Sequence, residues 1–161
     1  MVRRRLANSP DTRRSVTGYV SVFAKGPISW KSKRQDSVAT STTTAEYQAL
    51  YESARSAVWI QQLLKELSFP VSGPTRIHVD NNGCKSMSSN HRTDALTKHI
   101  DVKFHYTRDL VDENRIDIQY CPTNLMIADF LTKPTPARKF LWCRDALNIK
   151  DIRSRGDVGT D

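Results

Sequence analysis

Three acidic residues stand at wide intervals in this chain, each in a setting suited to holding a divalent metal ion. They are Glu46 in the run TAEY, Asp80 in IHVDNN and Asp129 in IADFLTKP. Carboxylate oxygens are ligands that Mg²⁺ prefers, and two such ions about 3.5–4 Å apart can activate a water for phosphodiester hydrolysis. The chemistry they suggest is that of a metal-dependent nuclease. Each acid alone is weak support, because a lone Asp or Glu at a helix start more often caps that helix.

The elements that must position these acids can be predicted from residue patterns. Two β-rich runs flank Ala24-Lys25-Gly26 and predict a hairpin. Apolar residues at helical spacing then predict a long helix, with Thr42 and Thr43 as candidate caps. The predicted strands cover residues 16–23, 27–33, 76–79 and 116–121, and the predicted helices cover residues 44–67, 82–89, 99–113, 125–131 and 137–147.

This order of elements predicts a mixed α/β sheet with helices covering its faces. Glu46 falls at the start of the long helix, Asp80 at the carboxyl end of a strand, and Asp129 on the helix after the last strand. Ligand sites of open α/β sheets lie at the carboxyl ends of strands. We therefore expect the three carboxylates to converge on one or two cations.

Composition indicates a single folded domain inside the cell. The 161 residues, with 38% hydrophobic and 26% charged, are enough for one core without disulfides. No apolar run approaches the roughly 20 residues of a membrane span, and no signal-peptide pattern is present. Three cysteines without a CxxC pair argue against a disulfide framework or a zinc site. We expect a monomeric protein of the cytoplasm or nucleus, with no membrane partner.

The net charge of +8 lies wholly in the first fifth of the chain. Residues 1–34 hold nine Lys or Arg and one acid, while residues 35–161 hold sixteen of each sign. A basic face favours a polyanion such as nucleic acid. A solvated surface that only aids solubility is an equally good interpretation of the charge alone.

Taken together, the motifs of residues 7–147 resemble the ribonuclease H domain at the C-terminal end of copia-type (Pseudoviridae-like) retrotransposon polyproteins. A chain of phrases in one order and spacing is far more specific than any single phrase. The matching phrases are DTRRSVTGYV from Asp11, PISWKSKRQ from Pro27, AEYQAL from Ala45, DNN from Asp80, TKHID from Thr97 and ADFLTKP from Ala128.

The resemblance implies a ribonuclease H-like fold, a mixed five-stranded sheet flanked by helices, over residues 1–148. Residues 149–161 are expected to form a polar, disordered tail. The implied activity is hydrolysis of the RNA strand of RNA–DNA hybrids with Mg²⁺ or Mn²⁺. Glu46, Asp80 and Asp129 match the second, third and fourth acids of the family's metal-binding set. The implied setting is a longer reverse transcriptase polyprotein.

One departure from the family bears directly on activity. The family's first strand carries an Asp-Ala-Asp-Trp-Ala phrase whose first Asp bridges the metal ions, and the aligned run here is Arg3-Arg4-Arg5-Leu6-Ala7. Asp11, in the turn before the hairpin, is a poor substitute. We therefore expect an altered, incomplete first strand over residues 1–8 and impaired cleavage. The alternative function is that of a non-catalytic relic that binds nucleic acid through its basic N-terminal third.

Several polar residues flank the acids and are candidates for contacting the hybrid. Thr42, Thr43, Asn81 and Asn82 could hydrogen-bond sugar edges, where the 2′-OH distinguishes RNA. Helix capping by the threonines and a turn at the asparagines would explain them equally well. Lys98 and His99 match a family phrase and could contact a phosphate, whereas an ordinary helix start would also account for His99.

The three tryptophans, Trp30, Trp59 and Trp142, could stack on nucleic-acid bases. Each lies within a patterned apolar element, so packing in the core is the favoured prediction.

Overall fold

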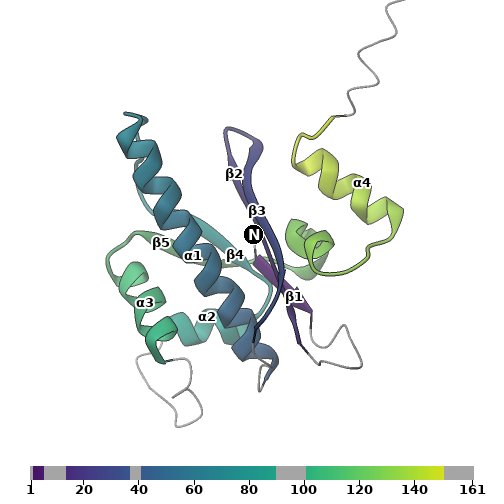
Figure 1. The fold of residues 1–161 in the computed structure, drawn as a ribbon, viewed down its shortest axis with the longest axis horizontal. Helices are drawn as coiled ribbons and strands as arrows, with labels where there is room; N and C mark the ends of the chain where they lie inside the picture. Colours follow the sequence, from purple (N-terminus) through teal and green to yellow (C-terminus); the bar gives the residue numbers. More distant parts are fainter. Residues whose placement is uncertain (1, 6–13, 37–40, 90–100, 151–161) are drawn as a thin grey trace, which may run out of the picture.

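A computed structural model describes residues 2–5, 14–36, 41–89 and 101–150 (Figure 1). The strands are β1 (Val2–Arg5), β2 (Val16–Phe23), β3 (Gly26–Arg34), β4 (Thr75–Val79) and β5 (Ile116–Tyr120). The helices are α1 (Thr42–Glu66), α2 (Asn82–Ser89), α3 (Asp101–Asp112) and α4 (Ala137–Ala146), with short 3₁₀ helices η2 (Thr123–Leu125) and η3 (Ile127–Leu131). The predicted strands and helices are therefore found close to their expected bounds, except that η2 and η3 replace the single helix predicted at residues 125–131. The first two residues of the helix predicted at 99–113 lie outside the described residues.

The strands are ordered β3-β2-β1-β4-β5, so β1 occupies the centre. On one side, β3, β2 and β1 pair antiparallel, and on the other side β4 and β5 pair parallel. The two parts are joined through one parallel pair, Val2 beside Val79. The mixed α/β class predicted from the sequence is thus confirmed. In the described residues, the short β1 is the only strand that joins the antiparallel and parallel parts of the sheet.

The hairpin turn and the start of α1 are both defined by local backbone geometry. Ala24 and Lys25 have φ of 48° and 66°, the left-handed backbone of a tight hairpin turn that matches the twist of the strands. The cap of α1 is Ser41, whose side chain accepts the backbone N–H of Thr44 at 3.1 Å. The prediction that Thr42 and Thr43 cap this helix is wrong, because both already lie inside its first turn.

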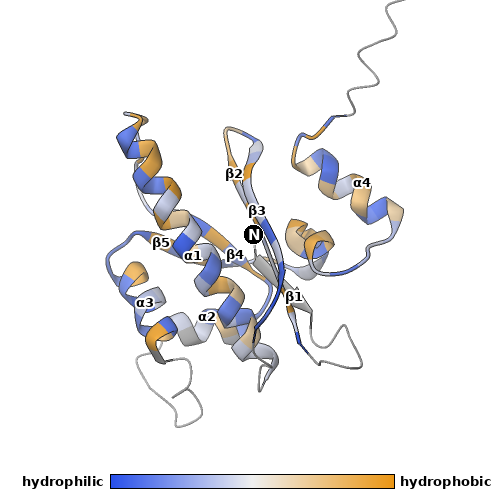
Figure 2. Ribbon diagram, in the orientation of Figure 1, coloured by the Kyte–Doolittle hydropathy of each residue, from blue (hydrophilic) through white to orange (hydrophobic). Residues whose placement is uncertain are grey.

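Two apolar clusters cover opposite faces of the sheet. Neighbouring strand residues point to opposite faces. Tyr19 belongs to the larger cluster beneath α1 and α3, while Val20 belongs to a smaller cluster beneath η3 and α4. In the larger cluster the rings of Tyr47 and Phe104 stack with centroids 3.9 Å apart. Figure 2 shows the alternation of apolar and polar residues along α1 that this one-sided packing requires.

The tryptophans do not pack in the core, contrary to the prediction. Trp30 is 65% exposed, Trp59 61% and Trp142 38%. For Trp59, the apolar pattern of α1 gave the wrong prediction. Small residues fill the buried side of this helix: Ala49, Ala54 and Ala57 face the sheet, while Trp59 faces solvent.

No helix in the described ranges combines the length and apolar character that a membrane crossing requires. Of the predicted tail at residues 149–161, all but the first two residues lie outside the described part of the chain.

Candidate functional site

Glu46 lies in the second turn of α1, on the side of the helix that packs toward the sheet. Its side chain is only 8% exposed, and its neighbours Ala45 and Tyr47 are fully buried. The Ser41 cap fixes the start of the helix one turn earlier. A carboxylate held this way has a fixed position, which a metal ligand requires.

Asp80 follows the last residue of β4, at the carboxyl end of that strand as predicted. Its Oδ2 accepts a hydrogen bond from the Thr123 hydroxyl at 3.3 Å. The next residue, Asn81, accepts the backbone N–H of Cys84 at 3.1 Å through its Oδ1. Asn81 therefore begins α2 in the manner of a helix cap, which favours the structural interpretation of this residue.

Asp129 lies in η3 and is 4% exposed. The predicted single helix at residues 125–131 is two 3₁₀ helices, because Met126 between them has an extended backbone. The Asp129 carboxylate forms an ion pair with Lys133, Nζ to Oδ2 3.1 Å.

A glycine on β2 lets the Asp129 segment approach the sheet. A Cβ at Gly18 would lie 2.5 Å from Thr132 Cγ2 and 3.0 Å from Leu131 Cβ, closer than real contacts allow. The Ser32 hydroxyl on β3 adds a hydrogen bond to the Leu131 carbonyl at 2.6 Å. η3 is therefore seated directly on β2 and β3 at the level of Gly18.

The register of β1 places Arg3 between two parts of this site. Its backbone is opposite Gly18 on β2, the residue on which η3 rests. On the other side, Val2 is paired with Val79, so the next residues along the two parallel strands are Arg3 and Asp80. The position that aligns with the missing acid thus lies between the Asp80 and Asp129 segments. The side chains of residues 2–5 are outside the described atoms.

Buried thiols lie beside the candidate acids. Burial raises the pKa of Cys84, and the negative charges of Glu46 and Asp80 raise it further. Cys84 is fully buried, and the charges of both Glu46 and Asp80 act on its thiol. Burial likewise raises the pKa of Cys121, with Asp80 contributing, and that of Cys143, where Asp129 raises it and Lys139 opposes.

The described side chains do not assemble the three-acid metal site that we expected. Within residues 14–36, 41–89 and 101–150, no group of three or more His, Cys, Asp or Glu is arranged to hold one metal ion. Asp129 is engaged by Lys133, and a protonated thiol lies beside Glu46 and Asp80. The acids border one region of the fold without forming a ready ligand set.

Some of the polar residues predicted to contact nucleic acid lie in the described part of the chain, and others do not. Thr43 lies against the start of α2, since a Cβ at Gly83 would be 3.5 Å from its Cγ2 and 3.6 Å from its Oγ1. The first turns of α1 and α2 therefore meet, which brings Thr43 close to Asn81 and Asn82. Lys98 and His99 lie outside the described residues, and α3 begins after them at Asp101.

Sequence reasoning did not single out Lys133 or Cys84 as neighbours of the acids. Lys133 stands four residues after Asp129, a spacing that brings opposite charges together on a helical turn, so this partner could have been found. The place of Cys84 follows from the packing of α2 against α1, for which no local signal exists.

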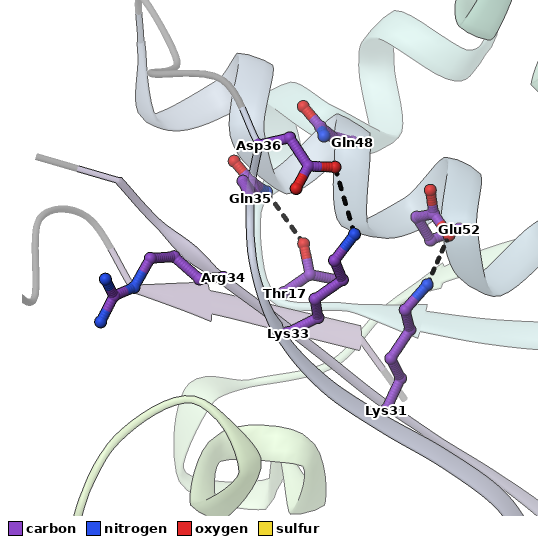
Figure 3. A pocket seen from close by; sticks show the side chains of 8 residues that line it. All are labelled: Thr17, Lys31, Lys33, Arg34, Gln35, Asp36, Gln48 and Glu52. Atoms are coloured by element: carbon purple, nitrogen blue, oxygen red, sulfur yellow. Dashed lines mark hydrogen bonds and ion pairs between the residues drawn. The ribbon is translucent and has the colours of Figure 1, made fainter. Parts of the chain in front are cut away.

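A polar pocket lies beside this region, between β3 and α1 (Figure 3). Lys31 pairs with Glu52 at 2.9 Å and Lys33 with Asp36 at 3.1 Å, both on the α1 side of the strand. The Gln35 amide donates to Thr17 Oγ1 and to the Ala45 carbonyl, both at 3.0 Å. These bonds tie β2, the end of β3 and α1 together directly beside Glu46.

We predict that all three cysteines are protected in the native protein. Cys84, Cys121 and Cys143 are buried and each has a raised pKa, so little thiolate is exposed to an alkylating reagent. Iodoacetamide should label the native chain at least about tenfold more slowly than the urea-unfolded chain. Mass spectrometry of timed samples would measure each site. Labelling of Cys84 at the unfolded rate would contradict the packing of α2 against α1.

Comparison with known proteins identifies several that are similar in sequence to this chain. No protein-family model matches the chain, and no solved structure matches it. The Retrovirus-related Pol polyprotein from transposon TNT 1-94 of Nicotiana tabacum is 38% identical over 144 residues, which are 89% of this chain and 11% of that polyprotein.

Two polyproteins of Arabidopsis thaliana match at similar levels. The Retrovirus-related Pol polyprotein from transposon RE2 is 34% identical over 80% of this chain and 9% of its own length. That from transposon RE1 is 33% identical over 83% of this chain and 9% of its own length. The chain spans about a tenth of the length of these curated relatives. It is homologous to one segment of plant retrotransposon Pol polyproteins.

Proposed function

We propose that this chain is the ribonuclease H domain of a copia-type retrotransposon polyprotein, with hydrolysis of RNA in RNA–DNA hybrids impaired by loss of the first catalytic acid. The observation that carries the proposal is the register of β1. The central strand aligns Arg3 with Gly18 on one side and extends toward Asp80 on the other. An acid at this position would join the segments that carry Asp80 and Asp129, and an arginine stands there instead.

The charge at this position is large enough to decide activity. Two unit charges 4 Å apart at an effective dielectric of about 20 interact by about 4 kcal/mol. An arginine repels a divalent cation, and the attraction of the missing carboxylate is lost as well. Because about 1.4 kcal/mol changes an affinity tenfold, the weaker binding of the cation amounts to a thousandfold or more, as an order of magnitude. Arginine side chains are long and can turn toward solvent, which weakens the repulsion but does not replace the lost carboxylate ligand.

The cation proposed for the ancestral site is Mg²⁺ or Mn²⁺, which would activate a water at the scissile phosphate. Among the described residues, Glu46, Asp80 and Asp129 form no three-ligand group and Asp129 is bound to Lys133, so a further acid would be needed to hold such an ion. What these residues supply is a rigid acidic border: Glu46 is held by α1 and Asp80 by the end of β4.

A second candidate function is binding of nucleic acid without turnover. The hairpin of β2 and β3, residues 16–34, carries four Lys or Arg and no Asp or Glu. Such a surface attracts a polyanion, and its binding weakens as salt displaces the released counterions. Binding does not require the missing acid, so the chain can retain it where cleavage is lost.

We predict that the purified chain cleaves an RNA–DNA hybrid barely above background in Mg²⁺ while still binding it. Mn²⁺ should support at most a trace of cleavage, because its ligand preferences differ from those of Mg²⁺ only modestly. A labelled hybrid would report cleavage on a denaturing gel and binding by fluorescence anisotropy at increasing salt. Robust Mg²⁺-dependent cleavage that Asp80→Asn abolishes would overturn the impaired-enzyme proposal and show that another group replaces the lost acid.

A further inference from the structure

Trp30 is the most exposed of the tryptophans and lies on an edge strand. β3 has a described neighbour on one side only, and Trp30 is paired there with Val20. Val20 is buried beneath η3, whereas the indole of Trp30 is 65% exposed. The apolar surface under η3 therefore continues outward at Trp30 into solvent. Ile28, at the irregularity in the pairing of β2 with β3, is also exposed.

On this face of β3, the contact with η3 lies at Ser32, and Trp30 lies beyond it. Alternate residues of a strand share a face, so Trp30, Ser32 and Arg34 lie along one side of β3. Ser32 donates its hydroxyl to the Leu131 carbonyl of η3, the helix that also carries Asp129. Trp30 thus lies about 7 Å along the strand from a residue that contacts the acid-bearing segment.

The surroundings of Trp30 are cationic. Lys31 and Lys33 point to the other side of β3 and are paired with Glu52 and Asp36, whereas Arg34 points away from them (Figure 3). Within the described part of the chain, neither Arg34 nor Lys25 in the hairpin turn has a carboxylate partner. An exposed aromatic ring on a hairpin that also carries Arg34 and Lys25 suits a polyanion with flat apolar groups, such as a nucleic-acid strand.

The other two tryptophans lack this combination. Trp59 is almost as exposed, but α1 carries three Glu against one Arg and one Lys. The Trp142 ring is already covered by the Lys139 ammonium, 4.1 Å from its centroid. Of the three tryptophans, only Trp30 combines an exposed indole ring with a strand that carries basic residues and no acidic ones.

We propose that the Trp30 face of β3 binds a single nucleic-acid strand, with a base stacked on the indole and the backbone phosphates at Arg34 and Lys25. This rests on the proposed nucleic-acid function and adds a surface outside the acidic region. Stacking on an aromatic ring tolerates any base, because every base has a flat face. The occupant is thus the unpaired strand that extends from a hybrid, held beside the segment carrying Asp129.

Fluorescence of Trp30 itself tests the proposal. In the Trp59→Phe, Trp142→Phe chain, Trp30 is the only tryptophan, and a short oligodeoxythymidylate in EDTA should quench it. Anisotropy of the labelled oligonucleotide with the otherwise unmodified chain should show about 5- to 100-fold weaker binding after Trp30→Ala. Trp59→Ala, an equally exposed matched control, should change binding less than about twofold. Arg34→Gln should reduce the salt dependence of binding by about one phosphate contact.

Equal losses from Trp30→Ala and Trp59→Ala, or none from either, would overturn the proposal. So would concentration-dependent self-association that Trp30→Ala abolishes, since the face would then bind a second copy. Circular dichroism of each variant establishes that the fold is retained. The oligonucleotide-binding assay is run in EDTA, without a metal ion. Its outcome is therefore independent of whether the chain cleaves a hybrid. Retained hybrid binding with no single-strand binding would reject the Trp30 surface and leave the proposed function standing.

Discussion

Arg3→Asp, combined with a few residues added before the first strand, should raise Mg²⁺-dependent cleavage of an RNA–DNA hybrid by about a thousandfold or more. The substitution exchanges a repelling charge for a ligand at the position between the Asp80 and Asp129 segments. The added residues would continue alongside Thr75–His78 of β4. In the described part of the chain, Val2 and Val79 are the one strand pair that joins the two halves of the sheet. Initial rates on a labelled hybrid would measure the gain.

Arg4→Asp is the matched control for this repair. It makes the same change in charge one residue along, but the backbone of Arg4 is opposite Thr17, and Thr17 lies in the pocket on the α1 side of the sheet. It should therefore restore little activity. Glu46→Gln in the repaired chain should abolish the gain. If Arg4→Asp restored as much cleavage as Arg3→Asp, the effect would be one of net charge, and the site assignment would fail.

The elements of this fold could be predicted from sequence because their signals are local. β2 and α2 have the bounds predicted, and the hairpin turn lies at Ala24-Lys25, between the two β-rich runs that predicted it. The cap of α1 was missed by one residue because Ser41, Thr42 and Thr43 are all good cap residues. Only the backbone decides which of them precedes the helix.

The site was harder to predict because it depends on packing between distant segments. The sequence indicates that Glu46, Asp80 and Asp129 lie at element ends, but not whether their carboxylates meet. The position of the Cys84 thiol near the acids comes from the packing of α2, whereas the Lys133 ion pair is local and follows from its spacing to Asp129. The tryptophans were misplaced for a related reason, since an apolar residue in a patterned element need not be on its buried side.

The positions of the acids depend on packing in the hydrophobic core as well as on contacts within the site. Glu46 precedes Tyr47, whose ring is fully buried and stacked on Phe104 of α3. The first turns of α1 also meet the start of α2 next to Asp80. Loss of the Tyr47 ring should therefore loosen the acidic region as well as the core.

Tyr47→Ala should lower the free energy of unfolding by about 3–5 kcal/mol, the usual cost of truncating a buried aromatic ring. Its centroid lies 3.9 Å from that of Phe104, and both side chains are at most 1% exposed, so the cavity could not be filled by solvent without wetting the core. A domain is stable by only about 5–15 kcal/mol, so this loss should move the urea midpoint strongly or prevent folding. Tyr47→Phe keeps the ring and should cost far less. Tyr51→Ala, one turn further along at a half-buried ring, should fall between them. A loss below about 1 kcal/mol for Tyr47→Ala, measured by urea denaturation, would show that α1 is not anchored to α3 through this pair.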